Sequence, residues 1–258
     1  MTEIMIRFDG VTYSYNKQPL IEDMDLSFEK GKITTIVGPN GCGKSTVLKL
    51  ASGLLQPNKG KVFLKDQEIK GMKRKAFARE VSVLLQSSHI PDMTVEQAVM
   101  SGRYPYQSPI SLSSQEDKRL AQYAMKMACC ESLRDKNMGR LSGGERQRAF
   151  LAMVLAQDTP LIFLDEPTTY LDINVSYEIM DLISSLNRKM EKTIVLVLHD
   201  LHLALNYSDR IAVMEKGRII AYDEASGQGL HDCIRDIFKV NIRRLSENSK
   251  SYYYSFKI

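Results

Sequence analysis

A glycine-rich segment, residues 38–46, most constrains how this chain can fold, because a strand pattern precedes it and a helix pattern follows it. Residues 33–37 are apolar or β-branched, as in a buried strand, and residues 47–50 continue as a helix. The spacing Gly-x4-Gly-Lys-Ser over residues 38–45 is that of a P-loop. Glycines let backbone N–H groups turn toward a ligand, and the helix N-terminus adds positive partial charge. The segment therefore predicts a strand–loop–helix unit that binds the phosphate chain of a nucleotide.

Two residues of this segment have specific expected roles. Lys44 is expected to reach the β- and γ-phosphates, and Ser45 to ligate Mg²⁺. The other residues are expected to shape the loop and to present backbone donors. The predicted binding segment comprises Gly38, Pro39, Asn40, Gly41, Cys42, Gly43, Lys44, Ser45 and Thr46.

A pair of acidic residues follows a second apolar run, residues 161–164, which fits a strand buried on both faces. A doubly wound sheet holds its ligand at the carboxyl ends of such strands. Asp165 is therefore placed to hold Mg²⁺ through water, and Glu166 to polarise an attacking water. Acid pairs are common, so this pair gains its weight from the P-loop that precedes it.

The segment Ser142-Gly143-Gly144-Glu145 opens a helix pattern over residues 146–155, and so forms a second helix N-terminus with free N–H donors. It resembles the signature motif of ATP-binding cassette (ABC) ATPases. In that family the motif of one subunit closes over the γ-phosphate held by the P-loop of the other. The resemblance therefore implies that Ser142, Gly143 and Gly144 bind nucleotide.

Further residues match the motifs of this family in order, and the resemblance covers at least residues 8–222. Gln86 resembles the Q-loop glutamine, Asp172 belongs to a D-loop-like sequence, and His199 resembles the switch histidine. The resemblance implies ATP and Mg²⁺ as cofactors and nucleotide contacts from Gln86 and Asp172. It implies catalysis by Glu166, His199 and Lys44, and metal binding by Ser45, Gln86 and Asp165.

The family also keeps an aromatic residue that stacks on adenine, ahead of the P-loop. Tyr15 is favoured here by its spacing to the loop, and Tyr13 is the rival. The sequence leaves the choice between them open.

The predicted fold is α/β, an ABC ATPase of the P-loop NTPase class, with a RecA-like core, an antiparallel β subdomain and an inserted helical subdomain. One domain spans 1–258, with the core over about 1–86 and 158–258 and the helical subdomain over about 87–157. Strand patterns stop within the helical part, where helices are expected over 94–101 and 114–129. Ser114 is the expected cap of the second helix. Leu120, Tyr123, Ala124 and Met127 are expected to lie on one face of that helix.

Composition limits the location and the partners of the chain. No stretch approaches the roughly 20 apolar residues that cross a bilayer, and residues 1–8, with Glu3 and Arg7, lack a signal pattern. We therefore expect a cytoplasmic protein, held by the family resemblance peripherally at the cytoplasmic face of the cell membrane. The net charge of +4 is modest, with its densest basic cluster over residues 70–79, and no nucleic-acid partner is expected.

The four cysteines lack metal-ligand spacing, which fits a reducing compartment. Cys42 lies inside the P-loop, where the helix N-terminus and Lys44 should favour its thiolate. We expect Cys42 to react with thiol reagents and ATP to protect it. Only a small residue is needed there, so the sulfur itself is not expected to serve catalysis.

Details of the motifs favour membrane import. Residues 102–105, 165–172 and 38–43 resemble the ATPases of the iron-siderophore, haem and vitamin B12 importers. Ferric siderophore is the first choice, with haem and cobalamin import or a non-import ABC ATPase as alternatives. The implied partners are a second identical ATPase subunit, transmembrane permease subunits and, indirectly, a substrate-binding protein. The segment 86–109, with Met93, Tyr104 and Tyr106, is the expected permease contact.

Overall fold

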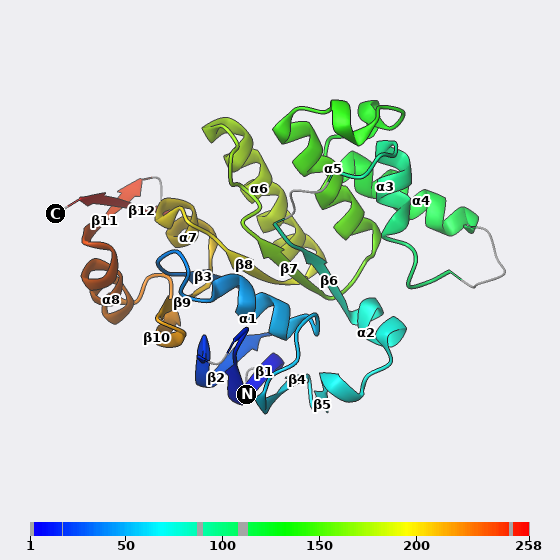
Figure 1. The fold of residues 1–258 in the computed structure, drawn as a ribbon. Coiled ribbons are helices and arrows are strands. Elements are labelled where there is room, and N and C mark those ends of the chain that lie inside the picture. The colour runs from blue at the N-terminus through cyan, green and yellow to red at the C-terminus, as the bar shows by residue number, and fades with distance from the viewer. Residues whose placement is uncertain (1–2, 17, 87–89, 108–112, 248–249, 258) are drawn as a thin grey trace.

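The computed structural model describes residues 3–16, 18–86, 90–107, 113–247 and 250–257. Two sheets, a helical layer and a C-terminal hairpin make up the fold (Figure 1). Residues 87–89 and 108–109 of the expected permease-contact segment lie outside the described residues. No helix in the described ranges is long and apolar enough to span a membrane.

The central sheet has the strand order β10-β9-β3-β8-β7-β6. Its strands are β3 (Ile33–Val37), β6 (Val81–Leu84), β7 (Leu161–Asp165), β8 (Thr193–Val197), β9 (Arg210–Glu215) and β10 (Arg218–Glu224). All neighbours pair in parallel except β10, which runs antiparallel to β9. Every residue of β3, β7 and β8 is buried, as the continuous apolar runs predict for strands covered on both faces.

A second, antiparallel sheet has the order β2-β1-β4-β5. It consists of β1 (Ile4–Tyr13), β2 (Ile21–Glu29), β4 (Lys59–Leu64) and β5 (Gln67–Glu68). Helix α1 (Lys44–Ala51) shares one core with this sheet and with one face of the central sheet. Alternation along β7 puts Leu161 and Phe163 in that core. Asp165, two residues further on, therefore points to the same side as α1.

The other face of the central sheet packs against α5 (Gly143–Ala156), α6 (Ile173–Met190), α7 (Leu201–Tyr207) and α8 (Gln228–Phe238). A third core joins α3 (Val95–Ser101), α4 (Gln115–Met127) and α5, which gather at one end of the molecule (Figure 1). The remaining short elements are α2 (Arg74–Glu80) and the 3₁₀ turns η1 (Ile69–Gly71), η2 (Glu131–Leu133) and η3 (Met138–Arg140). This arrangement confirms the predicted α/β class with its antiparallel sheet and helical insertion.

Ser114 is the N-cap of α4 as predicted, and the four residues expected on one face of this helix, Leu120, Tyr123, Ala124 and Met127, line the same cavity. The helix buries Asp117, Ala121, Ala124 and Met125, whereas Tyr123 is half exposed. Small alanines let α4 pack closely on α3 and α5. The larger Tyr123 instead lines a small apolar cavity that α4 shares with α6.

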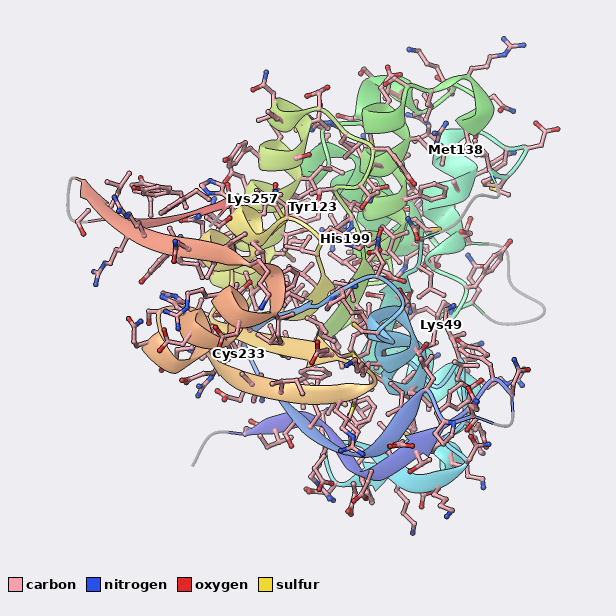
Figure 2. All side chains as sticks on the ribbon, turned by 60° about the vertical axis from the view of Figure 1, so that its left-hand side comes forward. Lys49, Tyr123, Met138, His199, Cys233 and Lys257 are labelled. Carbon is pink, nitrogen blue, oxygen red and sulfur yellow. The ribbon has the colours of Figure 1, made fainter. Side chains whose placement is uncertain are left out.

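The chain ends in a hairpin of β11 (Val240–Glu247) and β12 (Lys250–Lys257), which forms a sheet of its own. It lies at the end of the molecule opposite α3 and α4, next to α7 and α8 (Figure 1). Figure 2 shows the side chains from another side, with Cys233 on α8 and Lys49 on α1 on opposite sides of the view. Residues 239–258 contain five Lys or Arg residues and one Glu.

Candidate functional site

The P-loop is held in shape by close backbone packing and by one buried lysine. A Cβ at Gly38 would lie 2.2 Å from the carbonyl oxygen of Met214, and Gly43 has a φ of +107° that only glycine adopts freely. The Lys44 ammonium is buried and donates to the carbonyls of Gly38 at 2.9 Å and Pro39 at 3.0 Å. These contacts fix the shape of the loop.

A polar cavity of about 410 Å³ opens over this loop. It brings together residues from the P-loop, from Gln86 after β6, and from the ends of β7 and β8. Its lining residues are Leu20, Asn40, Gly41, Gly43, Lys44, Ser45, Thr46, Gln86, Glu166 and His199.

Ser45 and Asp165 lie in direct contact, because the Ser45 hydroxyl donates to Asp165 Oδ1 at 3.0 Å. Burial, together with the charge of Glu166, raises the pKa of Asp165 despite this hydrogen bond. The positive charges nearby do not offset the burial of this carboxylate, so a cation would stabilise it. Carboxylate and hydroxyl oxygens together are ligands of the kind that Mg²⁺ binds. The residues present fit a magnesium site.

Glu166 has an unusual backbone conformation for a non-glycine residue. Its φ is +53°, and its N–H donates to the Val197 carbonyl at 3.1 Å, which ties this turn to β8. Such left-handed positions cost free energy and concentrate at functional sites.

Three side chains hold the Glu166 carboxylate. Gln86 Nε2 donates to Oε2 at 3.0 Å, and the Thr169 hydroxyl donates to the same oxygen at 3.1 Å. His199 Nε2 lies 2.5 Å from the other oxygen, Oε1. The carboxylate is 11% exposed, so it faces the cavity while its orientation is fixed by the protein. The geometry suits a base that takes a proton from a water beside the phosphates.

Thr169 was missed by the sequence analysis. It stands within residues 165–172, but nothing in its residue type distinguishes it from Thr168 before the turn is seen. The turn at Glu166 brings Thr169 back toward the carboxylate, because the Thr169 N–H donates to the Glu166 carbonyl at 3.3 Å.

Tyr13 and Tyr15 occupy different environments. Tyr13 ends β1 and is 9% exposed within the core, whereas Tyr15 lies beyond the strand and is 54% exposed. The Tyr15 hydroxyl is 3.4 Å from Thr46 Oγ1, and its ring meets Tyr13 edge-on at 5.0 Å. Only Tyr15 of the two therefore offers a free ring face beside the P-loop.

The signature residues do not lie in this cavity. Ser142 caps α5 in a capping box with Glu145, and Ser142 and Gly143 are exposed. Asp172 caps α6 by accepting from the Val175 N–H at 3.0 Å. None of Ser142, Gly143, Gly144 and Asp172 is among the residues that line the cavity over the P-loop.

The structure does not favour the thiolate of Cys42, and the expected reactivity of this residue stays a prediction. Its thiol is 5% exposed, and burial raises the pKa of Cys42 more than the charge of Lys44 lowers it. Cys42 does precede a helix N-terminus, as the sequence indicated, but its thiol points into the core between the two sheets.

The expected permease-contact segment is exposed at only one of its two tyrosines. Tyr104 is 68% exposed. Tyr106 instead lies between two guanidinium groups, with Arg103 at 4.0 Å and Arg79 at 5.3 Å from its ring centre. These cations partly cover the ring, so Tyr106 is less exposed than Tyr104, and its expected role as a permease contact stays a prediction.

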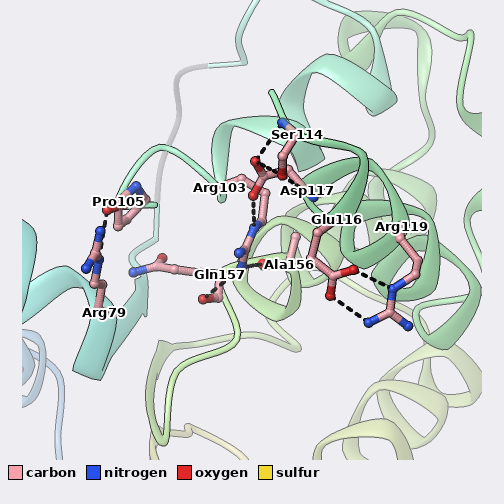
Figure 3. Close-up of polar contacts among 9 residues, drawn as sticks. All are labelled: Arg79, Arg103, Pro105, Ser114, Glu116, Asp117, Arg119, Ala156 and Gln157. Atoms are coloured by element: carbon pink, nitrogen blue, oxygen red, sulfur yellow. Dashed lines mark hydrogen bonds and ion pairs between the residues drawn. The ribbon is translucent and has the colours of Figure 1, made fainter. Parts of the chain in front are cut away.

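Arg103 is itself part of a buried network (Figure 3). It donates to Asp117 Oδ1 at 2.9 Å and to the Ala156 carbonyl at 2.7 Å, and so joins α3, α4 and α5. Asp117 also accepts from the Ser114 backbone and hydroxyl in the capping box of α4. From the core side, Arg79 donates to the Pro105 carbonyl at 3.0 Å. This loop is therefore fixed to both the helical layer and α2.

Comparisons with known proteins relate the whole chain to a family and a fold. The family model described as ABC transporter matches residues 21–169. The petrobactin import ATP-binding protein FpuD of Bacillus anthracis is 41% identical over 231 residues, covering 89% of this chain and 85% of that protein. The ferric enterobactin transport ATP-binding protein FepC of Escherichia coli is 40% identical over 224 residues, covering 86% and 83%.

Solved structures show the same fold. A dimeric ATP-binding cassette in a post-hydrolysis state, bound to ADP and Pi, superposes with a TM-score of 0.75 at 26% identity, covering 86% of this chain and all of that one. CbiO1 of Clostridium perfringens, part of the transporter complex cbiONQ, gives a TM-score of 0.77 at 24% identity, covering 90% and 95%.

Proposed function

This chain belongs to the ABC transporter family, and from this premise we propose that it is the ATP-hydrolysing subunit of a membrane importer for ferric siderophores. The observation that carries the proposal is the Glu166 carboxylate, held by Gln86, Thr169 and His199 at the cavity over the P-loop. A chain that only bound nucleotide would not need an oriented base at this position.

The proposed roles follow from these contacts. Lys44 exchanges its two carbonyl partners for phosphate oxygens, and the loop backbone donates to the same phosphates. Glu166 takes a proton from the attacking water, and His199 holds the γ-phosphate and that water. Tyr15 stacks on adenine. Ser45, Asp165 and Gln86 would hold Mg²⁺, which when bound neutralises charge on the phosphates.

A second copy would complete the site. Support comes from the exposed Ser142 and Gly143, which lie outside the cavity of their own chain, and from Tyr170 and Ile173, which are 95% and 75% exposed. A relative of this fold is known as a dimer. We infer a head-to-tail dimer in which residues 142–144 of one copy close over the P-loop of the other, with Asp172 at the same interface.

Dimer formation can be tested with the Glu166→Gln variant, which should bind ATP and hydrolyse it slowly. Size-exclusion chromatography with ATP and Mg²⁺ is expected to give a dimer, and with ADP a monomer. A variant that remains monomeric in ATP and Mg²⁺, even with its permease present, would contradict the proposal.

The substrate class rests on relatives named for petrobactin and ferric enterobactin import. Permease subunits would hold the chain at the cytoplasmic face of the membrane, and a binding protein would deliver the chelate on the other side. Uptake of radioactive iron should be measured in cells that lack this chain and are complemented with wild type or with Glu166→Gln. Only wild type is expected to restore uptake of a ferric siderophore; restored uptake of labelled haem or cobalamin instead would change the substrate assignment.

A further inference from the structure

The C-terminal hairpin is attached to the helix that follows His199. Helix α7 makes its most extensive contact with β12, and Figure 2 shows the hairpin and His199 in one view. Tyr253 of β12 is 8% exposed and belongs to the core beneath α7, as does Ile242 of β11 in part. His231 of α8 packs against the Tyr253 ring at 5.2 Å. The hairpin is therefore packed against α7 and α8 and contributes to the core of the fold.

One side chain of α7 bonds to the backbone of β12 at two points. Asn206 Nδ2 donates to the Tyr253 carbonyl at 2.7 Å, and Asn206 Oδ1 accepts from the Tyr253 N–H at 2.9 Å. The amide thus pairs with Tyr253 as a neighbouring strand would. Asn206 Nδ2 also donates to the His202 carbonyl at 2.7 Å, one turn earlier in α7. We call this set of bonds the Asn206–Tyr253 clamp.

The N-terminal end of α7 follows His199, the residue that contacts Glu166. Asp200 caps the helix by accepting from the N–H groups of His202 at 2.7 Å and Leu203 at 3.2 Å. His199 precedes this cap directly, and its imidazole contacts Glu166. Helix α7 has only seven residues, so we expect it to move as a rigid body. A tilt of the helix at Asn206 would then shift the Asp200 cap and the adjoining His199 imidazole as well.

We propose that Asn206 is a positioning residue for ATP hydrolysis, which acts by holding α7 on the hairpin so that His199 faces Glu166. The inference rests on the proposed ATPase function and gives the C-terminal hairpin a part in it. Of the residues proposed to bind nucleotide, those of the P-loop and Tyr15 form no part of the clamp, and only the contact of His199 with the γ-phosphate depends on α7. Loss of the clamp is therefore expected to slow the chemical step and to leave nucleotide affinity unchanged.

The test compares Asn206→Leu and Asn206→Ala with a matched control, Asn187→Leu. Asn187 also bonds two carbonyls, those of Gly31 at 2.9 Å and Lys192 at 2.8 Å, but at the far end of α6. Phosphate release gives kcat, fluorescent ATP binding gives Kd, and thermal unfolding gives Tm for the full-length proteins. Leu keeps the approximate size of Asn, and Ala favours the helix, so at least one variant should fold.

We expect both Asn206 variants to lose about tenfold in kcat, because a misplacement of about 1 Å can cost ~10²-fold and the shift expected here is smaller. Their Kd should stay within about twofold of wild type by the same argument. Asn187→Leu should lower Tm and keep wild-type kcat at temperatures where it is folded. Unchanged kcat in a folded Asn206 variant overturns the proposal, and so does a weakening of Kd that matches the loss of kcat. Absence of hydrolysis in wild type and Asn187→Leu would instead overturn the proposed function.

Discussion

His199 and Glu166 meet at a single carboxylate oxygen: His199 Nε2 lies 2.5 Å from Glu166 Oε1, while Gln86 and Thr169 both donate to Oε2. The two oxygens therefore have different partners. Movement of His199 would free Oε1 for a water molecule without releasing the hold on Oε2. The proposed base can thus change its partner and keep its orientation.

Replacing Glu166 by Gln should retain ATP binding and lower kcat by about 10²–10⁴-fold, because the amide keeps the shape and cannot accept a proton. Phosphate release and fluorescent ATP binding measure the two quantities. Glu96→Gln is the matched control, since that partly exposed carboxylate forms a surface ion pair with Arg134, away from the cavity. Turnover near the wild-type level in Glu166→Gln would remove Glu166 as the base.

Thr169→Val should lower kcat by about tenfold. A hydrogen bond to a charged group contributes ~1.5–3 kcal/mol. If about half of this free energy stabilises the transition state, its loss slows the reaction by about tenfold. Valine keeps the shape of threonine without the hydroxyl. Thr169→Ser keeps the donor and should remain close to wild type. Equal turnover in the Val and Ser variants would show that the contact with Glu166 has no catalytic consequence.

Cys129 should react with thiol reagents well before Cys42, since Cys129 is exposed and the Cys42 thiol is buried with a raised pKa. A raised pKa means less thiolate at any given pH, so labelling of Cys42 should increase as the pH rises toward that pKa. Peptide mass spectrometry after timed labelling gives both rates. Cys42→Ser should remain active, and rapid labelling of Cys42 at neutral pH would contradict the buried position.

Asp117→Asn should destabilise the fold by about 3–5 kcal/mol, because it leaves the buried Arg103 without its counter-ion. Urea unfolding followed by circular dichroism measures the loss. Glu116→Gln, which breaks the exposed pair with Arg119, is the control and should leave the unfolding midpoint unchanged.

The same pair predicts a pH dependence. Burial alone would raise the pKa of Asp117, but hydrogen bonds from Ser114 and Arg103 outweigh it and lower the pKa below its usual value. A lowered folded-state pKa stabilises the fold above the unfolded value of about 3.9, and this contribution is lost as the pH falls through the folded pKa. Wild type should therefore lose stability below about pH 4 more steeply than Asp117→Asn. Parallel pH curves would show that the carboxylate is not the group concerned.

Tyr104→Ala should leave hydrolysis by the isolated chain intact and reduce permease binding and ferric-chelate uptake, because the ring is largely exposed at the surface. Tyr106→Ala should instead lower thermal stability, since its ring lies between Arg79 and Arg103. Co-purification with the permease and iron uptake distinguish the two variants. Normal uptake with Tyr104→Ala would move the proposed contact elsewhere.

The sequence predicted those features that depend on local order along the chain. The P-loop, the acid pair after β7 and the cap at Ser114 each depend on residues within a few positions of one another. Their elements could be assigned because backbone geometry, strand periodicity and capping are short-range effects. The division into core and helical subdomain, and the roles of the site residues, stay predictions.

The features that escaped prediction depend on tertiary neighbours. Burial of Cys42 is set by the second sheet, and the covered ring of Tyr106 by Arg79, which belongs to α2. Thr169 reaches Glu166 only because of the left-handed turn at that residue. Asn206 finds its partner 47 positions later in the chain. No local pattern encodes such pairs, because each is made by the packing of distant elements.

The basic character of the C-terminal segment 239–258, which comprises Lys239 and the hairpin, has a consequence for the solubility of the protein. Residues 239–258 contain five basic residues and one acidic residue, which accounts for the whole formal net charge of +4. The rest of the chain is thus formally neutral at pH 7. Proteins without net charge lack the mutual repulsion that keeps them dispersed. A chain that ended before Lys239 would carry no formal net charge at pH 7, so we expect this C-terminal segment to favour dispersal of the molecule in solution in addition to its packing.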